Sequence, residues 1–495
     1  MSPSPTPRRG LLAPLAAAML LAGCASMQGV APSTAQLRDA PSLGLNAADP
    51  AQRAAEVAPL APNWWHALGD QQLDRLVEQA LAGNPNLRIA QARVAKAMAA
   101  VDGVDSSSGP QLNGAFDATH QRFTAKGMIP APLAGSVQDT ATLQLNGSWE
   151  IDFFGRHRAA LDAALGTAQA AQAEVAAART LLSTNVVRTY LQIARLNEQA
   201  ALARRALTQR EAMLDLVQQR VRAGLDGNLE LRQSEGAVPD ARQQIEAVNE
   251  QLQLARNAMA ALIGQPAKDP LTQAPQLATL QPLRAAEAIP VDLLGRRADI
   301  AAARWRVEAA QGDVANARAQ FYPNINLVAY VGLSSIGLDE LFTSGARQWG
   351  VGPAVRLPIF DGGRLRANLR GRNADLDAAI DSYNAAVIEA VHEVADQLTS
   401  SRSVALQRTQ QQDSLRSAEA AYDIAEQRYR AGLSSHLQLL SAESAVLAQR
   451  RLDVDLRTRA LLTQVNLAQA LGGGWQPEAK VALSSPNTHA PSARP

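Results

Sequence analysis

The sequence Arg220-Val-Arg-Ala-Gly-Leu225 returns 208 residues later as Arg428-Tyr-Arg-Ala-Gly-Leu433. Upstream, Phe154-Gly-Arg156 aligns with Gly362-Gly-Arg364 at the same offset, so the spacing is kept over about 70 residues without an insertion or deletion. A repeat of this size is much longer than the modules of short solenoids. It indicates two duplicated halves of one structure.

Each half contains a segment that predicts an unusually long helix. Residues 156–223 and 364–431 contain no proline and one glycine each. A continuous helix of this length would extend about 100 Å. Over residues 182–221, apolar side chains recur in alternating steps of four and three, with Thr189 and Arg210 as exceptions, which indicates a coiled-coil seam. Both segments end in Ala-Gly-Leu, where glycine suits a left-handed helix cap.

Shorter helices are expected on either side of these segments. A return helix should follow each long helix, over residues 228–263 and 436–471. The first of them contains Gly236 and Pro239, which predict a kink because proline removes a backbone hydrogen bond. A helix near the start of the folded part should be interrupted at Asn84-Pro85.

Strands are predicted directly before each long helix. Residues 140–152 alternate strictly between apolar and polar side chains, which predicts a strand with two different faces. A partner strand is expected at 111–123, and residues 323–333 and 349–357 form the corresponding pair in the second half. Each half therefore supplies one hairpin, giving four strands per chain. If the apolar row faces lipid, the polar row from Thr142 to Glu150 faces water.

Composition narrows the class of protein. Aromatic residues make up only 4% of the chain and charged residues 19%, which favours helices packed through small side chains. The formal net charge of +1 gives no indication of a nucleic-acid partner.

The N-terminus is typical of a secretory leader. Arg8 and Arg9 precede an apolar stretch, residues 11–21, that is too short to span a bilayer. It ends in Leu21-Ala-Gly-Cys24, which resembles a bacterial lipobox, so Cys24 is expected to carry diacylglycerol and an N-acyl chain. Cys24 is the only cysteine, and an unpaired thiol is the alternative. No aspartate follows it, which favours the outer membrane.

The sequence thus predicts an organisation in consecutive parts. These are a signal peptide at 1–23, a lipidated tether at 24–62, a first structural repeat at 63–263, an equatorial connector at 264–290, a second repeat at 291–471, and a C-terminal equatorial segment with a flexible tail at 472–495.

Four strands cannot close on themselves in a bilayer, where every backbone polar group must be paired. Since the smallest membrane barrels have about eight strands, several chains must contribute. Two chains would supply eight strands and three would supply twelve, and only the larger number leaves room for a lumen. Taken separately, the strands could form an ordinary half-buried sheet and the helices a dimeric coiled coil. Their joint occurrence behind an acylated leader favours a barrel continued by a helical tube.

Several motifs resemble one known family. The opening of the folded part looks like that of the outer-membrane efflux lipoproteins of the TolC superfamily (NodT-type, OprM-like outer-membrane components of RND tripartite efflux systems). The matching motifs are Asn63-Trp-Trp65, Asn84-Pro-Asn-Leu87, Arg297-Ala-Asp-Ile300, Ala317-Arg-Ala-Gln-Phe-Tyr-Pro323 and Arg428-Tyr-Arg-Ala-Gly432. They fall in the family's order and at its separations, and the resemblance covers about residues 60–475.

The resemblance implies a mainly α fold with a membrane β-barrel: a homotrimer with a 12-strand β-barrel and a 12-helix α-barrel, lipid-anchored in the outer membrane with a periplasmic tube. Its expected function is the exit duct of a tripartite pump, a passive channel for small molecules such as drugs. Its expected partners are a periplasmic adaptor protein, an inner-membrane RND-type transporter and outer-membrane lipid. No enzyme activity, cofactor or metal site is expected, because no catalytic constellation is visible and the histidines lack metal-ligand spacing.

The resemblance also suggests gate residues at the helix tips. Leu437 and Ser441 match positions where side chains constrict the lumen, although Ser441 replaces a commonly acidic residue and Leu437 could be an ordinary packing leucine. Glu230 and Tyr429 match a carboxylate and a phenol whose contact keeps the tips shut, and Ser434 stands in place of that lock's usual arginine. The adaptor should meet the two tips. These are Ala223, Gly224 and Leu225, and Ala431, Gly432 and Leu433.

Two other functions fit parts of the sequence. The same architecture could serve as the outer-membrane channel of a protein secretion system. A non-conducting structural coiled-coil lipoprotein is the alternative outside transport. The exported substrate is not encoded in any motif of the chain.

Overall fold

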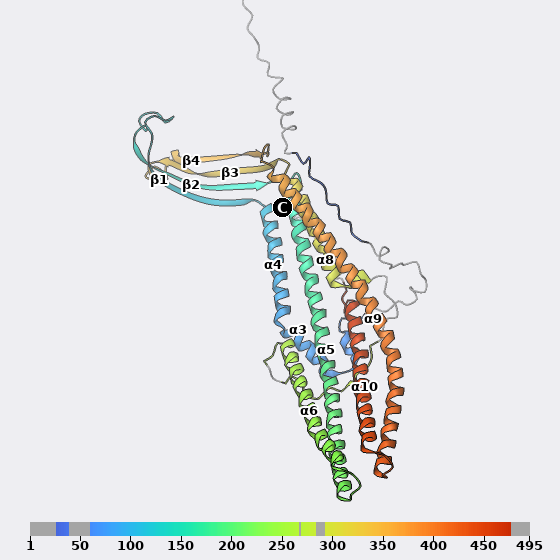
Figure 1. Cartoon of the computed structure of the whole chain (residues 1–495). Helices are drawn as coiled ribbons and strands as arrows, with labels where there is room; N and C mark the ends of the chain where they lie inside the picture. The colour runs from blue at the N-terminus through green and yellow to red at the C-terminus, as the bar shows by residue number, and fades with distance from the viewer. Residues whose placement is uncertain (1–25, 39–59, 267–268, 284–292, 477–495) are drawn as a thin grey trace, which may run out of the picture. The chain divides into compact units, whose positions relative to one another are not determined.

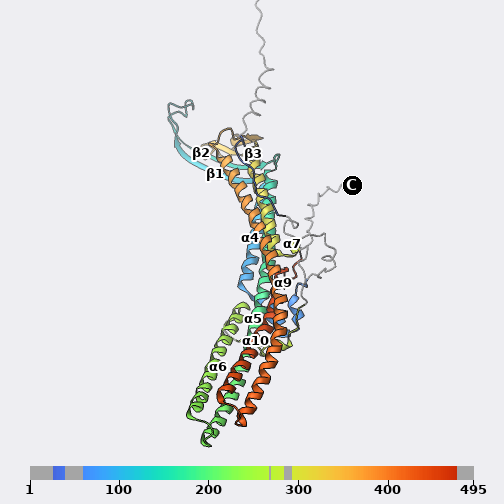
Figure 2. The same cartoon turned by 45° about the vertical axis from the view of Figure 1, so that its right-hand side comes forward.

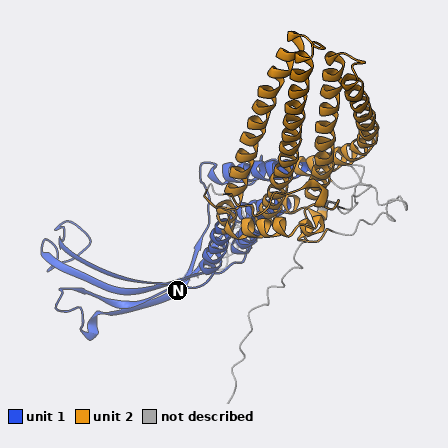
Figure 3. Ribbon diagram, turned by 90° about the horizontal axis from the view of Figure 1, so that it is seen from below, with its two compact units in different colours: residues 1–37, 92–172, 302–384 blue, residues 38–91, 173–301, 385–495 orange. Residues whose placement is uncertain are grey.

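The computed structural model describes residues 26–38, 60–266, 269–283 and 293–476. Cys24, predicted as the lipidated residue, lies outside the described residues. The chain divides into two compact units: residues 1–37, 92–172 and 302–384 form unit 1, and residues 38–91, 173–301 and 385–495 form unit 2 (Figure 3). Each unit takes segments from both sequence halves, so this division cuts across the duplication. The predicted domain boundaries stay a prediction.

Unit 1 contains one antiparallel sheet of four strands in the order β1-β2-β3-β4 (Figure 1). Its strands are β1 Gln111–Arg122, β2 Val137–Glu150, β3 Asn324–Ile336 and β4 Arg347–Arg356. The two predicted hairpins are confirmed, with strand ends shifted by up to three residues. The β2–β3 ladder joins the hairpin of one half to that of the other. Within the described chain, β1 pairs only with β2 and β4 only with β3, so each outer strand keeps one unpaired edge.

The register gives the sheet two chemically distinct faces. Leu145 pairs with Val331, which pairs with Trp349, so one apolar row crosses three strands. Directly paired residues of antiparallel strands face the same side of a sheet. On the other face Thr142 pairs with Ser334, and their hydroxyl oxygens lie 3.1 Å apart. The alternation predicted from the sequence is therefore continuous across the sheet.

The helices repeat the 208-residue offset at both ends. Helix α5 covers Arg156–Arg222 and α9 covers Arg364–Arg430, at 67 residues each, while α6 covers Asn228–Leu262 and α10 covers His436–Ala470, at 35 residues each. The long and return helices are thus confirmed to within one residue (Figures 1 and 2). Helix α6 contains Pro239 within one continuous element, and the kink predicted there stays a prediction.

Helices α4 (Pro85–Ser108) and α8 (Ala298–Ala319) precede the hairpins. In unit 1, α8 packs against the start of α5 at unusually close range. A Cβ atom added to Gly312 would lie 2.8 Å from the backbone nitrogen of Ala163, and one added to Gly166 would lie 2.9 Å from that of Ala309. Both distances are too short for a real side chain. Glycine is therefore required on each helix for this approach.

The core of unit 2 gathers short N-terminal elements around α5. The 3-10 helix η2 (Trp64–Leu68) and helix α3 (Gln71–Gly83) bury Trp64, Trp65 and Leu73 in one apolar cluster with residues of α5, α6 and α10. Asp70 caps α3 and accepts a 2.6 Å hydrogen bond from the buried Tyr190 hydroxyl. The interruption predicted at Asn84-Pro85 is confirmed, because Asn84 caps α3 and Pro85 begins α4.

Ion pairs connect neighbouring helices of unit 2. Arg195 of α5 pairs with Asp455 of α10 at 3.1 Å, and Arg450 of α10 pairs with Glu419 of α9 at 3.0 Å. Helix α6 joins α5 through further polar contacts. None of the helices in the described ranges combines the length and the apolar character that crossing a bilayer requires.

Candidate gate at the helix tips

Both long helices end in a glycine turn of the same geometry. Gly224 has a φ of 72° and Gly432 a φ of 74°, in the left-handed region that side chains other than glycine rarely adopt. The Leu225 N–H donates to the Arg220 carbonyl at 2.9 Å, and the Leu433 N–H donates to that of Arg428 at 2.8 Å. These bonds satisfy carbonyls at the helix ends, as predicted for the caps. Leu225 and Leu433 are exposed beyond them.

A hydrogen-bonded network joins the two tips within unit 2. The Tyr429 hydroxyl, from the last turn of α9, donates to Oδ2 of Asp226 at 2.6 Å. The guanidinium of Arg220, from the last turn of α5, binds both carboxylate oxygens of Asp226, at 2.8 and 3.1 Å. It also lies 4.7 Å from the centre of the Tyr429 ring. One carboxylate therefore holds groups from both long helices.

The electrostatics of this network favour the charged carboxylate. The Arg220 hydrogen bonds and the Tyr429 hydroxyl hold the pKa of Asp226 below its ordinary value of 3.8, although burial opposes this. Burial and the hydrogen bond to Asp226 raise the pKa of Tyr429 above its ordinary value of 10.0, so the phenol stays a donor at neutral pH. The side chains of Arg220 and Asp226 are only 13% and 9% exposed, but they lie at the ends of the helices, where water close by still screens the pair.

The structure corrects the partner expected for Tyr429. Glu230 does not receive the phenol: its carboxylate accepts the Gly227 N–H at 3.0 Å and caps the start of α6. A glutamate three residues after the N-cap commonly caps a helix, and this local contact is favoured over a contact to another tip. Asp226 and Arg220 were missed as site residues. The signal was present, because Arg220 opens the repeated stretch and Asp226 directly follows the turn.

His436, the first residue of α10, extends the network into the core. The side chain is buried, its Nε2 lies 3.2 Å from the Ser234 hydroxyl of α6, and its ring centre lies 5.5 Å from that of Tyr429. Burial lowers the pKa of His436 below its ordinary value of 6.5, partly opposed by the negative charges of Asp226 and Glu230. His436 was also missed as a site residue.

The two predicted constriction residues lie on the first two turns of α10. The Leu437 side chain is 66% exposed, so it does not pack within its own chain, and Ser441 is also exposed. Two residues after Ser441, Glu443 is buried and pairs with Arg210 of α5 at 3.3 Å. Arg210 also donates to the Ala237 carbonyl, which explains the charged position in the coiled-coil seam of α5. Within the described residues, no group of His, Cys, Asp or Glu side chains is arranged to hold a metal ion.

Comparison with known proteins places the chain in a family. The sequence model of the family described as "Outer membrane efflux protein" matches residues 76–265 and 289–473, two segments that correspond to the two halves. The chain belongs to this family. Its members are channels of the outer membrane rather than enzymes, and the chain is an outer-membrane efflux channel with a periplasmic helical part.

Individual relatives agree with this assignment. The fusaric acid resistance protein FusA of Burkholderia cepacia is 38% identical over 369 residues, covering 73% of this chain and 69% of that protein. The multidrug resistance outer membrane protein MdtP of Escherichia coli is 32% identical over 474 residues, covering 93% and 96%. The crystal structure of the outer membrane protein VceC of Vibrio cholerae superposes with a TM-score of 0.79 at 35% identity, covering 84% of this chain and 99% of that one.

Proposed function

We propose that the chain is the outer-membrane exit duct of a tripartite efflux pump, a passive channel gated at the periplasmic helix tips that exports small molecules such as drugs. The names of the relatives, which refer to multidrug and fusaric acid resistance, support this class of cargo. The main support for a gate is the Arg220–Asp226–Tyr429 network. A few charge-assisted hydrogen bonds can hold the tips closed and can be replaced by the contacts of a competing partner.

The sheet supports assembly as a homotrimer. The outer edges of β1 and β4 are unpaired in the described chain, and an unpaired strand edge cannot face lipid. Pairing β4 of one copy with β1 of the next satisfies both edges. Three copies would give a closed wall of twelve strands with the polar face inside, which leaves a lumen that eight strands would not. Exposed apolar residues on the outer helices of unit 2 fit the same assembly. They are Leu229 and Leu254 of α6 and Leu406 and Ile424 of α9.

The exposed tips suit an adaptor protein. Leu225 and Leu433 are exposed apolar side chains at equivalent positions of the two tips, next to the network that an adaptor would have to disrupt. A cap alone requires glycine but not leucine. We infer that a periplasmic adaptor binds these leucines and connects the duct to an inner-membrane RND-type transporter.

The lipid anchor on Cys24 is supported by the segment that follows it. Asp377 of α9 accepts hydrogen bonds from the Ser33 hydroxyl and from the backbone N–H groups of Thr34 and Ala35, at 2.7 to 2.9 Å. The side-chain amide of Asn373 donates to the Ala31 carbonyl at 2.7 Å. The chain beyond the proposed lipid is thus tied to the side of a long helix, which suits a tether. Incorporation of labelled palmitate into the wild type but not into Cys24→Ala tests the anchor.

Conductance and drug sensitivity together test the proposed function. The purified full chain should form discrete conducting channels in planar bilayers, whereas a structural spacer lipoprotein would conduct nothing. Deleting the gene should raise sensitivity to some antibiotics, dyes or bile salts. An unchanged sensitivity profile combined with loss of an exported protein from the medium would instead assign the chain to protein secretion.

A further inference from the structure

A cationic surface surrounds the place where the strands of unit 1 end and the long helices begin. We define it as the arginine collar: Arg158 of α5, Arg356 of β4, and Arg364 and Arg366 of α9. All four side chains are exposed. Arg158 and Arg366 are related by the 208-residue offset, so each half contributes the same arginine pattern to its first helical turn.

The helix dipole does not favour arginine at the start of a helix. The first turn of a helix carries a partial positive charge and favours acidic side chains. The first turns of α5 and α9 contain no acidic residue. Cations placed there are unfavourable for the helix itself. Their presence in both halves points to a contact with a negative group outside the chain.

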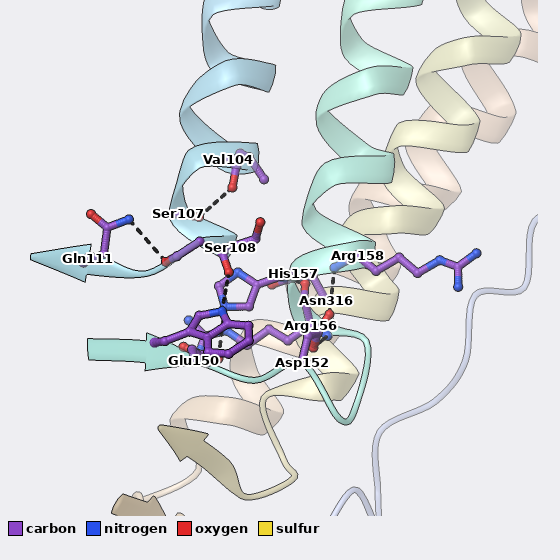
Figure 4. A network of polar contacts seen from close by, with 12 residues as sticks. Val104, Ser107, Ser108, Gln111, Glu150, Asp152, Arg156, His157, Arg158 and Asn316 are labelled. Atoms are coloured by element: carbon purple, nitrogen blue, oxygen red, sulfur yellow. Dashed lines mark hydrogen bonds and ion pairs between the residues drawn. The ribbon is translucent and has the colours of Figure 1, made fainter. Parts of the chain in front are cut away.

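The nearby carboxylates are occupied by other bonds (Figure 4). Asp152 accepts the backbone N–H groups of Arg156 and Arg158 at 2.7 and 3.0 Å. Glu150 lies 3.2 Å from the Arg156 guanidinium and 3.3 Å from the His157 ring. Figure 4 shows the Arg158 side chain extending away from these groups.

In the second half, Asp361 accepts the N–H groups of Gly363 and Leu365 in the same way, at 2.9 and 2.8 Å. Across the described residues, none of the four collar arginines lies within ion-pairing distance of a carboxylate. Asp361 attracts Arg364 electrostatically, but no carboxylate of the described residues forms an ion pair with a collar guanidinium. The collar therefore presents guanidinium groups that are available to a negative group outside the chain.

Large apolar side chains lie directly beside the collar. Phe153 is 63% exposed and Phe360 92% exposed, and Phe154 stacks on Tyr322 with ring centres 5.0 Å apart. Arg356 and Arg364 line a hollow of about 530 Å³ together with this stacked pair. Exposed aromatic side chains next to cationic ones are typical of the boundary between membrane and water, where rings enter the lipid and charges meet headgroups.

We propose that the arginine collar binds the phosphate groups of anionic phospholipids in the periplasmic leaflet of the outer membrane. A guanidinium can bind two phosphate oxygens at once, and the adjacent phenylalanines fit the acyl region of the same lipid. Binding fixes the depth of the sheet in the bilayer and offsets the unfavourable charge at both helix starts. The inference rests on the proposed function only in requiring that the strands lie in the outer membrane.

Lipid retention by the full-length protein tests the proposal. The detergent-solubilised protein is mixed with equal amounts of phosphatidylglycerol and phosphatidylcholine, and native mass spectrometry counts the lipids that remain bound. Wild type should retain phosphatidylglycerol preferentially. Each arginine near an anionic surface contributes about fivefold, so Arg364→Gln with Arg366→Gln should reduce that preference by about 25-fold. Raising salt from about 0.1 M to 1 M should also weaken it.

A matched double variant controls for net charge. Arg204 and Arg205 are exposed on α5 in unit 2, and changing both to glutamine should leave the preference unchanged. Equal retention of the two lipids by the wild type, or an equal loss in both double variants, would overturn the proposal. Conductance of the Arg364/Arg366 variant in phosphatidylcholine bilayers separates the two claims, because channels that conduct without lipid preference leave the proposed function intact.

Discussion

Replacing Asp226 with asparagine should open the channel. Asparagine keeps the shape of the side chain but removes the charge that holds the Arg220 fork and the Tyr429 hydroxyl. Hydrogen bonds to charged groups contribute about 1.5–3 kcal/mol each, but exposed pairs contribute roughly 0–1 kcal/mol. Since the network is covered locally yet screened at the tips, we expect a loss of about 1–2 kcal/mol per chain. That loss corresponds to a roughly 5- to 30-fold shift toward open tips.

Single-channel recording in planar bilayers measures this shift. Asp226→Asn should show a larger mean conductance or a longer open time than the wild type. Asp215→Asn, the same chemical change on an exposed side chain of α5, is the matched control and should behave like the wild type. Glu230→Gln should have a smaller effect, because Glu230 caps its own helix. Identical records for the wild type and Asp226→Asn would refute the assignment of the network as the gate.

Three further predictions concern other parts of the chain. Burial in the closed tips lowers the pKa of His436 below 6.5, so the open tips bind a proton more readily than the closed ones. Closure should therefore weaken as the pH falls below about 6.5, and the open probability of the wild type should rise between about pH 7.5 and 5.5. A His436→Gln variant with the same pH dependence would contradict this. Gly312→Val should destabilise the detergent-solubilised protein by about 1–3 kcal/mol, because the added Cβ would collide with α5. Gly371→Ala should instead stabilise it by about 0.5–1 kcal/mol, because the added Cβ meets no atom within 4 Å. Thermal unfolding that ranks the two variants in the opposite order would contradict the close packing of α8 on α5. Asp377→Ala should abolish the slow amide hydrogen exchange of residues 34 and 35, and retained protection would show that the N-terminal segment is held by other contacts.

Periodic signals in the sequence predicted the elements well. Strict alternation located β2, and the absence of proline over two long segments located α5 and α9 to within one residue. The constant offset of 208 residues predicted the same strands and helices in both halves. Such features are recoverable because backbone geometry imposes a period on side chains over many residues.

The individual contacts at the helix tips were harder to predict from the sequence. Tyr429 was recognised, but its acceptor was assigned to Glu230 and not to Asp226, because sequence spacing does not reveal how the turn after Gly224 folds back. Arg210 stood out only as a break in an apolar seam, and its partner Glu443 lies more than 200 residues away. Cys24, the residue proposed to carry lipid, lies outside the described residues.

We propose that the channel needs more than one copy of this chain, because the outer edges of β1 and β4 have no partners within the described residues. The native mass of the detergent-solubilised, full-length protein tests it most directly. We expect three copies per particle without any cross-linker, and the same mass with and without reducing agent. A stable monomer under the same conditions would be incompatible with a barrel shared between chains.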